Sequence, residues 1–225
     1  MHRSSINRLA AILYSADALL VTMFVFCIVG SLTNPITRQL FDLDAEASIP
    51  AWFSSAQLLA AGIVFATRYN LGPHRSVGRS FFLLWSLALF FLSADEGVGF
   101  HEKISIVFRH VEFLPRFSGN HGIWIPLYAV AGTAFIAIVS RPSLRLWRSG
   151  NRGVAILFIG VIIFVCGAVL VEIIGYGELR EAINHRDYQI QVAVEEGLEL
   201  TGISTILIGG ILTCYAENTS QGDTG

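Results

Sequence analysis

The chain has 225 residues, of which 53% are hydrophobic and 14% are charged, whereas soluble domains average about 25% charged residues. This composition indicates a membrane protein, and a formal net charge of −2 argues against nucleic-acid binding, which needs a basic face. The three cysteines, Cys27, Cys166 and Cys214, lie inside apolar stretches. That placement is typical of small buried side chains and not of a disulfide framework or a zinc site.

Six apolar segments reach or approach the roughly 20 helical residues needed to cross a hydrocarbon core. They cover approximately residues 9–32, 50–68, 81–101, 122–140, 153–176 and 191–215. The third reaches full length only with Asp95 and Glu96 inside it, and the sixth only with Glu199. The alternative is therefore a protein of four spans with two re-entrant or interfacial segments.

Two segments between the spans are also expected to be helical. Residues 103–114 place apolar side chains at helical spacing, which favours a helix that lies in the membrane interface or extends the third span. Residues 36–46 indicate a shorter helix. The sequence thus predicts an all-α fold, a polytopic membrane helix bundle of about six transmembrane helices. We expect residues 1–216 to form a single integral-membrane domain and residues 217–225 to form a flexible polar C-terminal tail.

The basic residues predict the orientation of the bundle. With six spans, the two termini and the loops at residues 69–80 and 141–152 share one side of the membrane, and nine of the 15 Lys and Arg residues fall there. These two loops contain no acids, whereas the loops on the other side carry several. Because positively charged loops stay inside, we expect both termini in the cytoplasm.

Carboxylates gather at the outward ends of three predicted helices. The third span ends with a D-E pair followed by H-E, the fifth carries one glutamate near its outer end, and the sixth begins with E-E-x2-E. At about 100° per residue, Asp95 and Glu102 share nearly one face of a continuous helix. Acids beside membrane-length apolar segments are costly and are usually functional. The set comprises Asp95, Glu96, His101, Glu102, Glu172, Glu195, Glu196 and Glu199.

Such a cluster cannot remain fully ionised, because desolvation and mutual repulsion disfavour charged carboxylates. A divalent metal can bind them, and oxygen ligands with one nitrogen suit iron, manganese or zinc. Alternatively, the acids can share protons, or they can be neutralised by Arg109, Arg180 and Arg186.

For a metal centre we expect different roles within the set. The expected metal ligands are Asp95, His101, Glu102, Glu195 and Glu199, and the expected catalytic groups, which orient ligands or transfer protons, are Glu96, Glu172 and Glu196. Further candidate ligands on the same side of the membrane are His110, His121 and His185.

Some of these acids also have a simpler explanation, which does not cover Glu199. Glu195 and Glu196 lie in a first helical turn, where the helix dipole favours negative charge, and Asp95 and Glu96 can mark a water-exposed interfacial boundary. Asp17 is separate from the set, inside the first span. We expect its carboxyl to form a helix-packing hydrogen bond with a serine or threonine, or a contact with a nearby arginine, and a proton relay is the alternative.

The D-E-x4-H-E pattern at residues 95–102, followed by E-E-x2-E at residues 195–199, resembles a group of small bacterial multi-pass membrane proteins without an established activity. The resemblance covers about the second half of the chain. It implies a location in the bacterial inner (cytoplasmic) membrane and no particular reaction.

Together these observations favour a metal-binding membrane protein whose site lies near the periplasmic leaflet. The leading hypothesis is that such a site belongs to a metal-dependent enzyme that acts on a lipid-like or quinone-like substrate. One alternative is a small proton-coupled transporter that uses the same acids, and another is a non-catalytic subunit of a membrane complex. The expected partners are the lipid bilayer and either another membrane protein or further copies of this chain, with no nucleic acid.

Overall fold

The computed structural model describes residues 3–29, 34–72, 78–116, 122–175 and 185–222, and none of these residues lies in a strand. Six helices are long and apolar enough to cross a membrane, so the prediction of an all-α bundle with six spans is confirmed, and the chain is a multi-pass membrane protein. The spans are Ser4–Cys27, Ile49–Leu71, Arg79–Val98, Trp124–Arg148, Gly153–Ile174 and Arg186–Tyr215.

Two of the spans combine α-helix with π-helix. α1 (Arg3–Phe24) continues as η1 (Val25–Val29), and α7 (Gly153–Val165) continues through η3 (Cys166–Val171) into α8 (Glu172–Ile174). The other spans belong to α3 (Ile49–Leu71), α4 (Arg79–Val98), α6 (Trp124–Arg148) and α9 (His185–Gly222). α9 begins before residue 191, where the sixth span was expected, and its helix extends past residue 216.

The third span ends earlier than the sequence indicates. Gly99 adopts a left-handed backbone conformation with φ 66°, and its N–H donates to the Asp95 carbonyl at 2.6 Å, so α4 ends at Val98. A second helix, α5 (Phe100–Phe108), follows at once. The expected boundaries at residue 101 and at residues 103–114 are therefore wrong, because a glycine that tolerates positive φ divides this segment.

The short helix expected within residues 36–46 is α2 (Pro35–Leu40). The side chain of Asn34 caps it by accepting hydrogen bonds from the backbone N–H groups of Ile36 and Thr37 at 3.0 and 3.3 Å. Proline at the first helical position needs no such partner, since it has no N–H. Local capping therefore fixes where α2 begins.

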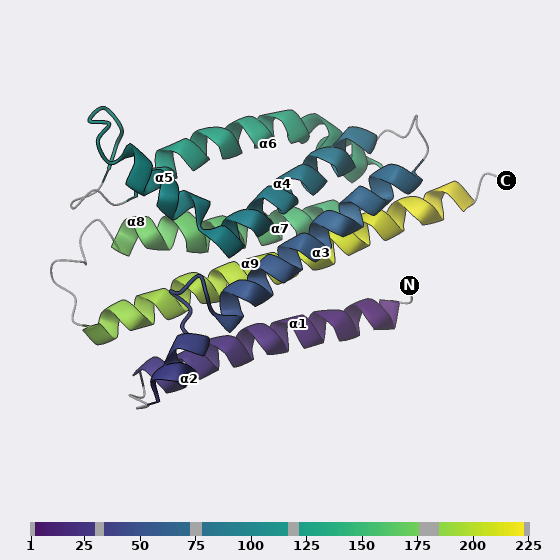
Figure 1. Cartoon of the computed structure of the whole chain (residues 1–225). Helices are drawn as coiled ribbons and strands as arrows, with labels where there is room; N and C mark the ends of the chain where they lie inside the picture. The colour runs from purple at the N-terminus through teal and green to yellow at the C-terminus, as the bar shows by residue number, and fades with distance from the viewer. Residues whose placement is uncertain (1–2, 30–33, 73–77, 117–121, 176–184, 223–225) are drawn as a thin grey trace.

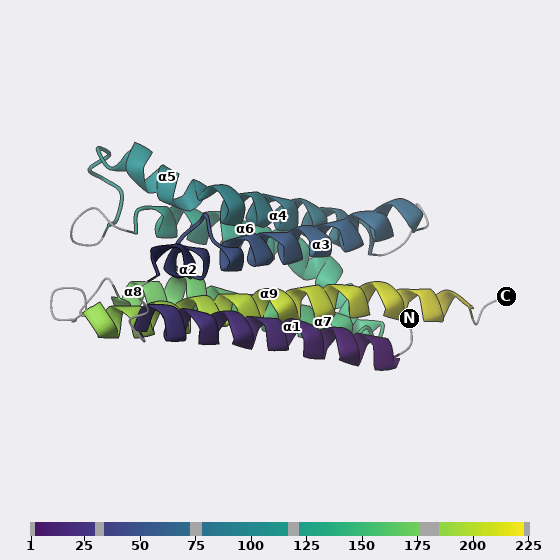
Figure 2. The same ribbon diagram turned by 60° about the horizontal axis from the view of Figure 1, so that its bottom comes forward.

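The helices form two layers, with α3, α4 and α6 in one and α1, α7 and α9 in the other (Figure 2). α1 begins and α9 ends at the same end of the bundle, whereas α2, α5 and α8 lie at the opposite end (Figure 1). We call this opposite end, with α5, α8 and the first turns of α9, the acidic end. Aromatic side chains such as Phe65, Phe81 and Trp85 fill the core between the layers at the other end.

α7 and α9 approach each other closely through glycines. A Cβ atom at Gly160 would lie 2.6 Å from the backbone nitrogen of Ile206, and a Cβ atom at Gly202 would lie 2.5 Å from that of Phe164. Small residues at such positions let the two backbones make direct van der Waals contact within a membrane. This contact fixes the position of α9, the helix that carries three of the candidate acids.

Candidate functional site

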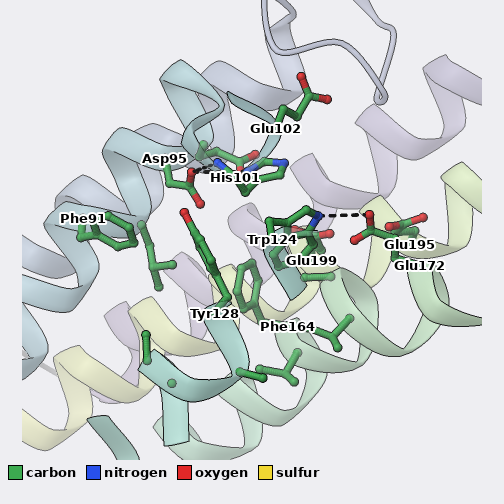
Figure 3. Close-up of a pocket in the computed structure, with 18 of the residues that line it drawn as sticks. Phe91, Asp95, His101, Glu102, Trp124, Tyr128, Phe164, Glu172, Glu195 and Glu199 are labelled. Atoms are coloured by element: carbon green, nitrogen blue, oxygen red, sulfur yellow. Dashed lines mark hydrogen bonds and ion pairs between the residues drawn. The ribbon is translucent and has the colours of Figure 1, made fainter. Parts of the chain in front are cut away.

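A cavity of about 1630 Å³ lies between the two layers and extends to the acidic end. Its walls come from α4, α5, α6, α7 with η3, and α9. Figure 3 shows part of its lining, with acids from α4, α5, α8 and α9 around it. All eight residues singled out from the sequence line this one cavity: Asp95, Glu96, His101, Glu102, Glu172, Glu195, Glu196 and Glu199.

Asp95 and His101 form a pair on the wall made by α4 and α5. The Asp95 Oδ1 atom accepts a hydrogen bond from the His101 backbone N–H at 2.9 Å and lies 3.3 Å from the His101 Nδ1 atom. The left-handed turn at Gly99 makes this possible, since it redirects the chain so that a residue six positions later returns to Asp95. A Cβ atom at Gly99 would also overlap the Glu46 carboxylate.

The same turn separates Asp95 from Glu102. Asp95 is buried, with 7% of its surface exposed, whereas Glu102 is exposed at the edge of the cavity. The prediction that both residues share one face of a continuous helix is wrong, because the helical phase is interrupted at Gly99. His101, which was expected to flank that face, is the actual partner of Asp95.

The imidazole of His101 is held in a negative environment. Burial by itself lowers the pKa of His101, but the hydrogen bond and charge of Asp95, together with the charges of Glu102 and Glu172, outweigh burial and raise the pKa above 6.5. A histidine held in this way can accept a proton at neutral pH. With Nδ1 against Asp95, the opposite ring nitrogen, Nε2, points away from the carboxylate.

Aromatic side chains of α6 connect the two walls. The indole Nε1–H of Trp124 donates to Glu172 Oε1 at 3.2 Å. The Trp124 ring also makes edge contacts with His101 and Tyr128, with ring centroids 5.3 and 5.2 Å apart. The Tyr128 hydroxyl points toward Asp95 (Figure 3). Trp124 therefore bridges the Asp95–His101 pair and Glu172.

The glutamates of α9 form the opposite wall. They lie close enough to repel one another, and the Glu96 carboxylate across the cavity also repels both Glu196 and Glu199. Arg109 also lines the cavity, but its Nε atom donates to the neighbouring His110 at 3.1 Å. This wall therefore holds several carboxylates within electrostatic reach of one another.

The expected metal ligands surround one cavity without meeting at one point. Among the described residues, no three His, Cys, Asp or Glu side chains are grouped so that they could hold a metal ion. Asp95 and His101 lie on one wall, and Glu195 and Glu199 lie on the other. Binding of a metal by these residues together would require their side chains to move.

The remaining expected residues lie elsewhere. His110 is exposed and does not line the cavity, and His121 and Arg180 fall outside the described residues. His185 begins α9, but its side chain is not among those described. Asp17 is buried in α1, away from the cavity lining.

Sequence reasoning missed the aromatic residues and the loop before α3. Trp124 and Tyr128 sit at the start of an apolar span, where aromatic residues are common at membrane interfaces, so their pattern carried no specific signal. Asp44 and Glu46 also line the cavity. Asp44 accepts a hydrogen bond from the Tyr188 hydroxyl at 2.9 Å, a contact between residues 144 positions apart that no local pattern indicates.

The chain belongs to the family described as "Domain of unknown function (DUF8692)", which matches residues 11–211. This chain has no match among the curated proteins or among the solved structures. The family description assigns no activity, so a function can be argued only from the site itself.

Proposed function

We propose that this protein is an enzyme of the bacterial inner membrane that acts on a lipid-like substrate, with a divalent metal held among the acids of its cavity. The acidic end faces the periplasm, as the distribution of arginines favours. One observation carries the proposal: acids and a histidine from four helices line one end of a cavity whose other walls are apolar. Such a cavity matches an amphipathic molecule whose head group meets the acids.

The length of the apolar part supports a lipid chain. From the acidic end, the lining runs along α4 from Asp95 to Leu84. At a rise of 1.5 Å per residue, this stretch corresponds to about 16 Å. The hydrocarbon core of a bilayer is about 30 Å thick, so the apolar part is about as long as one leaflet. A single lipid chain can therefore lie in it while the head group stays at the acidic end.

The Asp95–His101 pair supplies the acid–base group. Asp95 holds the imidazole through Nδ1, which leaves Nε2 to accept a proton from a water or from a hydroxyl of the substrate. The charges of Asp95, Glu102 and Glu172 stabilise the imidazolium that results. Trp124 keeps Glu172 in place beside this pair.

The acids that repel one another most directly are the best candidates for holding the metal. Glu96, Glu196 and Glu199 come from α4 and α9 and act on one another across the cavity. Hard divalent cations prefer such carboxylate oxygens. When bound, the metal would polarise a carbonyl or phosphoryl oxygen of the substrate or lower the pKa of a water. This division differs from the ligand set expected from the sequence, since it leaves Asp95 to position His101.

Elemental analysis of the purified protein tests the metal. We expect about one divalent metal per chain, and less than a tenth of that in Glu196→Gln and Glu199→Gln. Glu112→Gln is the matched control, since Glu112 is exposed and does not line the cavity. Only trace metal in the wild-type protein, unchanged by the two cavity substitutions, would refute a metal-dependent enzyme.

The lipid chain is tested separately by filling the cavity. Gly132 on α6 lines it, and a Cβ atom there would have no atom within 4 Å, so Gly132→Phe introduces its Cβ atom without a clash and adds a ring at the cavity lining. We expect mass spectrometry to find a lipid co-purifying with the wild-type protein and strongly reduced in this variant. Val130→Phe is the control, because Val130 is 73% exposed and lies outside the lining. Equal lipid content in all three proteins would contradict lipid binding in the cavity.

A proton-coupled transporter is the second candidate, and the mutual repulsion of Glu96, Glu196 and Glu199 favours it, because acids in this arrangement share protons readily. It predicts pH-dependent flux in liposomes without stoichiometric metal. The same elemental analysis therefore separates the two candidates.

A further inference from the structure

A second buried acid lies outside the cavity. Asp17 belongs to the span Ser4–Cys27, and only 3% of its surface is exposed. Neither of its carboxyl oxygens makes a hydrogen bond of normal geometry, and neither is accessible to water. A buried carboxyl without a partner is unusual, since buried polar groups are almost always hydrogen-bonded.

Polar side chains from two other helices surround this carboxyl. Gln57 on α3 and Ser204 on α9 are 4% and 0% exposed, and both lie beside the Asp17 carboxyl as neutral hydrogen-bonding groups, just outside normal hydrogen-bond geometry. They also bind each other, with Gln57 Nε2 donating to Ser204 Oγ at 3.1 Å. About one turn earlier in α1, the hydroxyls of Tyr14 and Thr205 are hydrogen-bonded at 2.9 Å. Oxygen atoms from three helices thus meet at one level of the bundle.

Among the described residues, no charged group is found to act on Asp17. Within four residues of Asp17, Gln57 or Ser204, the sequence contains no Lys, Arg or His. An uncompensated charge at mid-membrane costs about 2.5–3.5 kcal/mol on insertion scales. A bound cation removes that cost, and a monovalent one neutralises a single carboxylate without leaving excess positive charge.

We propose that Asp17, Gln57 and Ser204 form a binding site for a monovalent cation, Na⁺, between α1, α3 and α9. The Asp17 oxygens, the Gln57 side-chain carbonyl and the Ser204 hydroxyl provide only oxygen ligands, which hard cations prefer. The site is sealed from water, which favours a small ion that has lost its hydration shell. Transport proteins place Na⁺ in comparable surroundings near the membrane midplane.

The site is independent of the cavity. Ser204 follows Glu199 by five residues, which turns it about 140° around α9. Glu199 lies against Gly167 of η3, whereas a Cβ atom at Gly197, on the other side of α9, would lie 3.4 Å from Val21 of α1. α9 therefore presents its acids to the cavity and its hydroxyls to α1, so failure of one proposal leaves the other standing.

The test is the Na⁺ dependence of thermal unfolding of the full-length protein in detergent, with choline chloride keeping the ionic strength constant. We expect NaCl to raise the Tm of the wild type in a saturable way, as a ligand of the folded state does. Asp17→Asn abolishes the response, and Glu112→Gln, at an exposed acid outside both sites, retains it as the acidic control. Equilibrium binding of radioactive ²²Na⁺ should give one ion per chain in the wild type.

Ser204→Ala provides a second variant that keeps the carboxylate and removes one ligand. It should weaken the apparent Na⁺ affinity about tenfold without abolishing the response, so the proposal does not depend on whether Asp17→Asn folds. Equal Tm values for the wild type in NaCl and choline chloride would overturn the proposal. So would an unchanged Na⁺ response in Asp17→Asn, or an Na⁺-independent rise in Tm caused by that substitution, which would identify the carboxyl as permanently protonated.

Discussion

Gly167 of η3 controls how closely the acidic helix approaches its neighbour. A Cβ atom there would lie 2.7 Å from the Glu195 carbonyl oxygen and 2.9 Å from Glu199 Cγ, so Gly167→Ala forces α9 away from η3 by several tenths of an ångström. Overpacking of this kind costs about 1–3 kcal/mol, and the gain from replacing a helical glycine offsets about 0.5–1 kcal/mol of it. The expected net loss in the free energy of unfolding is about 1–2 kcal/mol.

Thermal unfolding in detergent measures this loss. For a chain of this size, 1 kcal/mol corresponds to about 2–4 °C, so the Tm of Gly167→Ala should fall by about 2–8 °C. The same substitution at Gly132, where a Cβ atom has no atom within 4 Å, should leave the Tm unchanged or raise it. The reasoning fails if Gly167→Ala is as stable as the wild type, or if both variants lose stability equally.

Three further predictions concern the turn between α4 and α5. Asp95→Asn removes the main group that raises the pKa of His101, so a histidine NMR titration should show this pKa falling toward 6.5 or below it. Because the folded state favours protonated His101, the stabilisation by this imidazolium is complete below pH 6.5 and is lost as the pH rises through the raised pKa. His101→Gln should therefore flatten the dependence of Tm on pH in this range. Gly99→Ala should lower the free energy of unfolding by at least about 1–2 kcal/mol, the penalty of a left-handed non-glycine residue, and chemical denaturation measures this loss. Gly97→Ala is the control and should be close to neutral, because its Cβ atom would meet only Ser55 at 3.4 Å or more.

The number of spans could be predicted from the sequence because length and hydropathy decide it. An apolar helix that can cover the hydrocarbon core satisfies all its backbone hydrogen bonds internally. Such a span can therefore be predicted without knowledge of the tertiary structure. The boundaries were less predictable. α4 ends at Val98 because Gly99 takes a positive φ, and a glycine inside an apolar segment gives no sign of the conformation it adopts.

The convergence of the acids also followed from topology, since alternate helix ends must share one side of a membrane. Which acids face each other did not follow, because it depends on helix rotation and on the break at Gly99. Asp95 therefore partners His101 and not Glu102. The cavity lies between α4, α5, α6, α7 with η3, and α9, and side-chain packing between layers leaves no periodic signal along the chain.

The charge of the cavity constrains any function it has. Its described lining includes nine carboxylic side chains but only Arg109 and His101 as basic ones, and Lys103, 3.6 Å from Glu46, adds one more at the edge. Two like charges 5 Å apart repel by about 3 kcal/mol at an effective dielectric constant of about 20. An anionic head group entering alone would add to this repulsion, whereas a cation or protons would relieve it. A metal-dependent enzyme and a proton-coupled transporter both satisfy this condition, and a carrier of free anions does not.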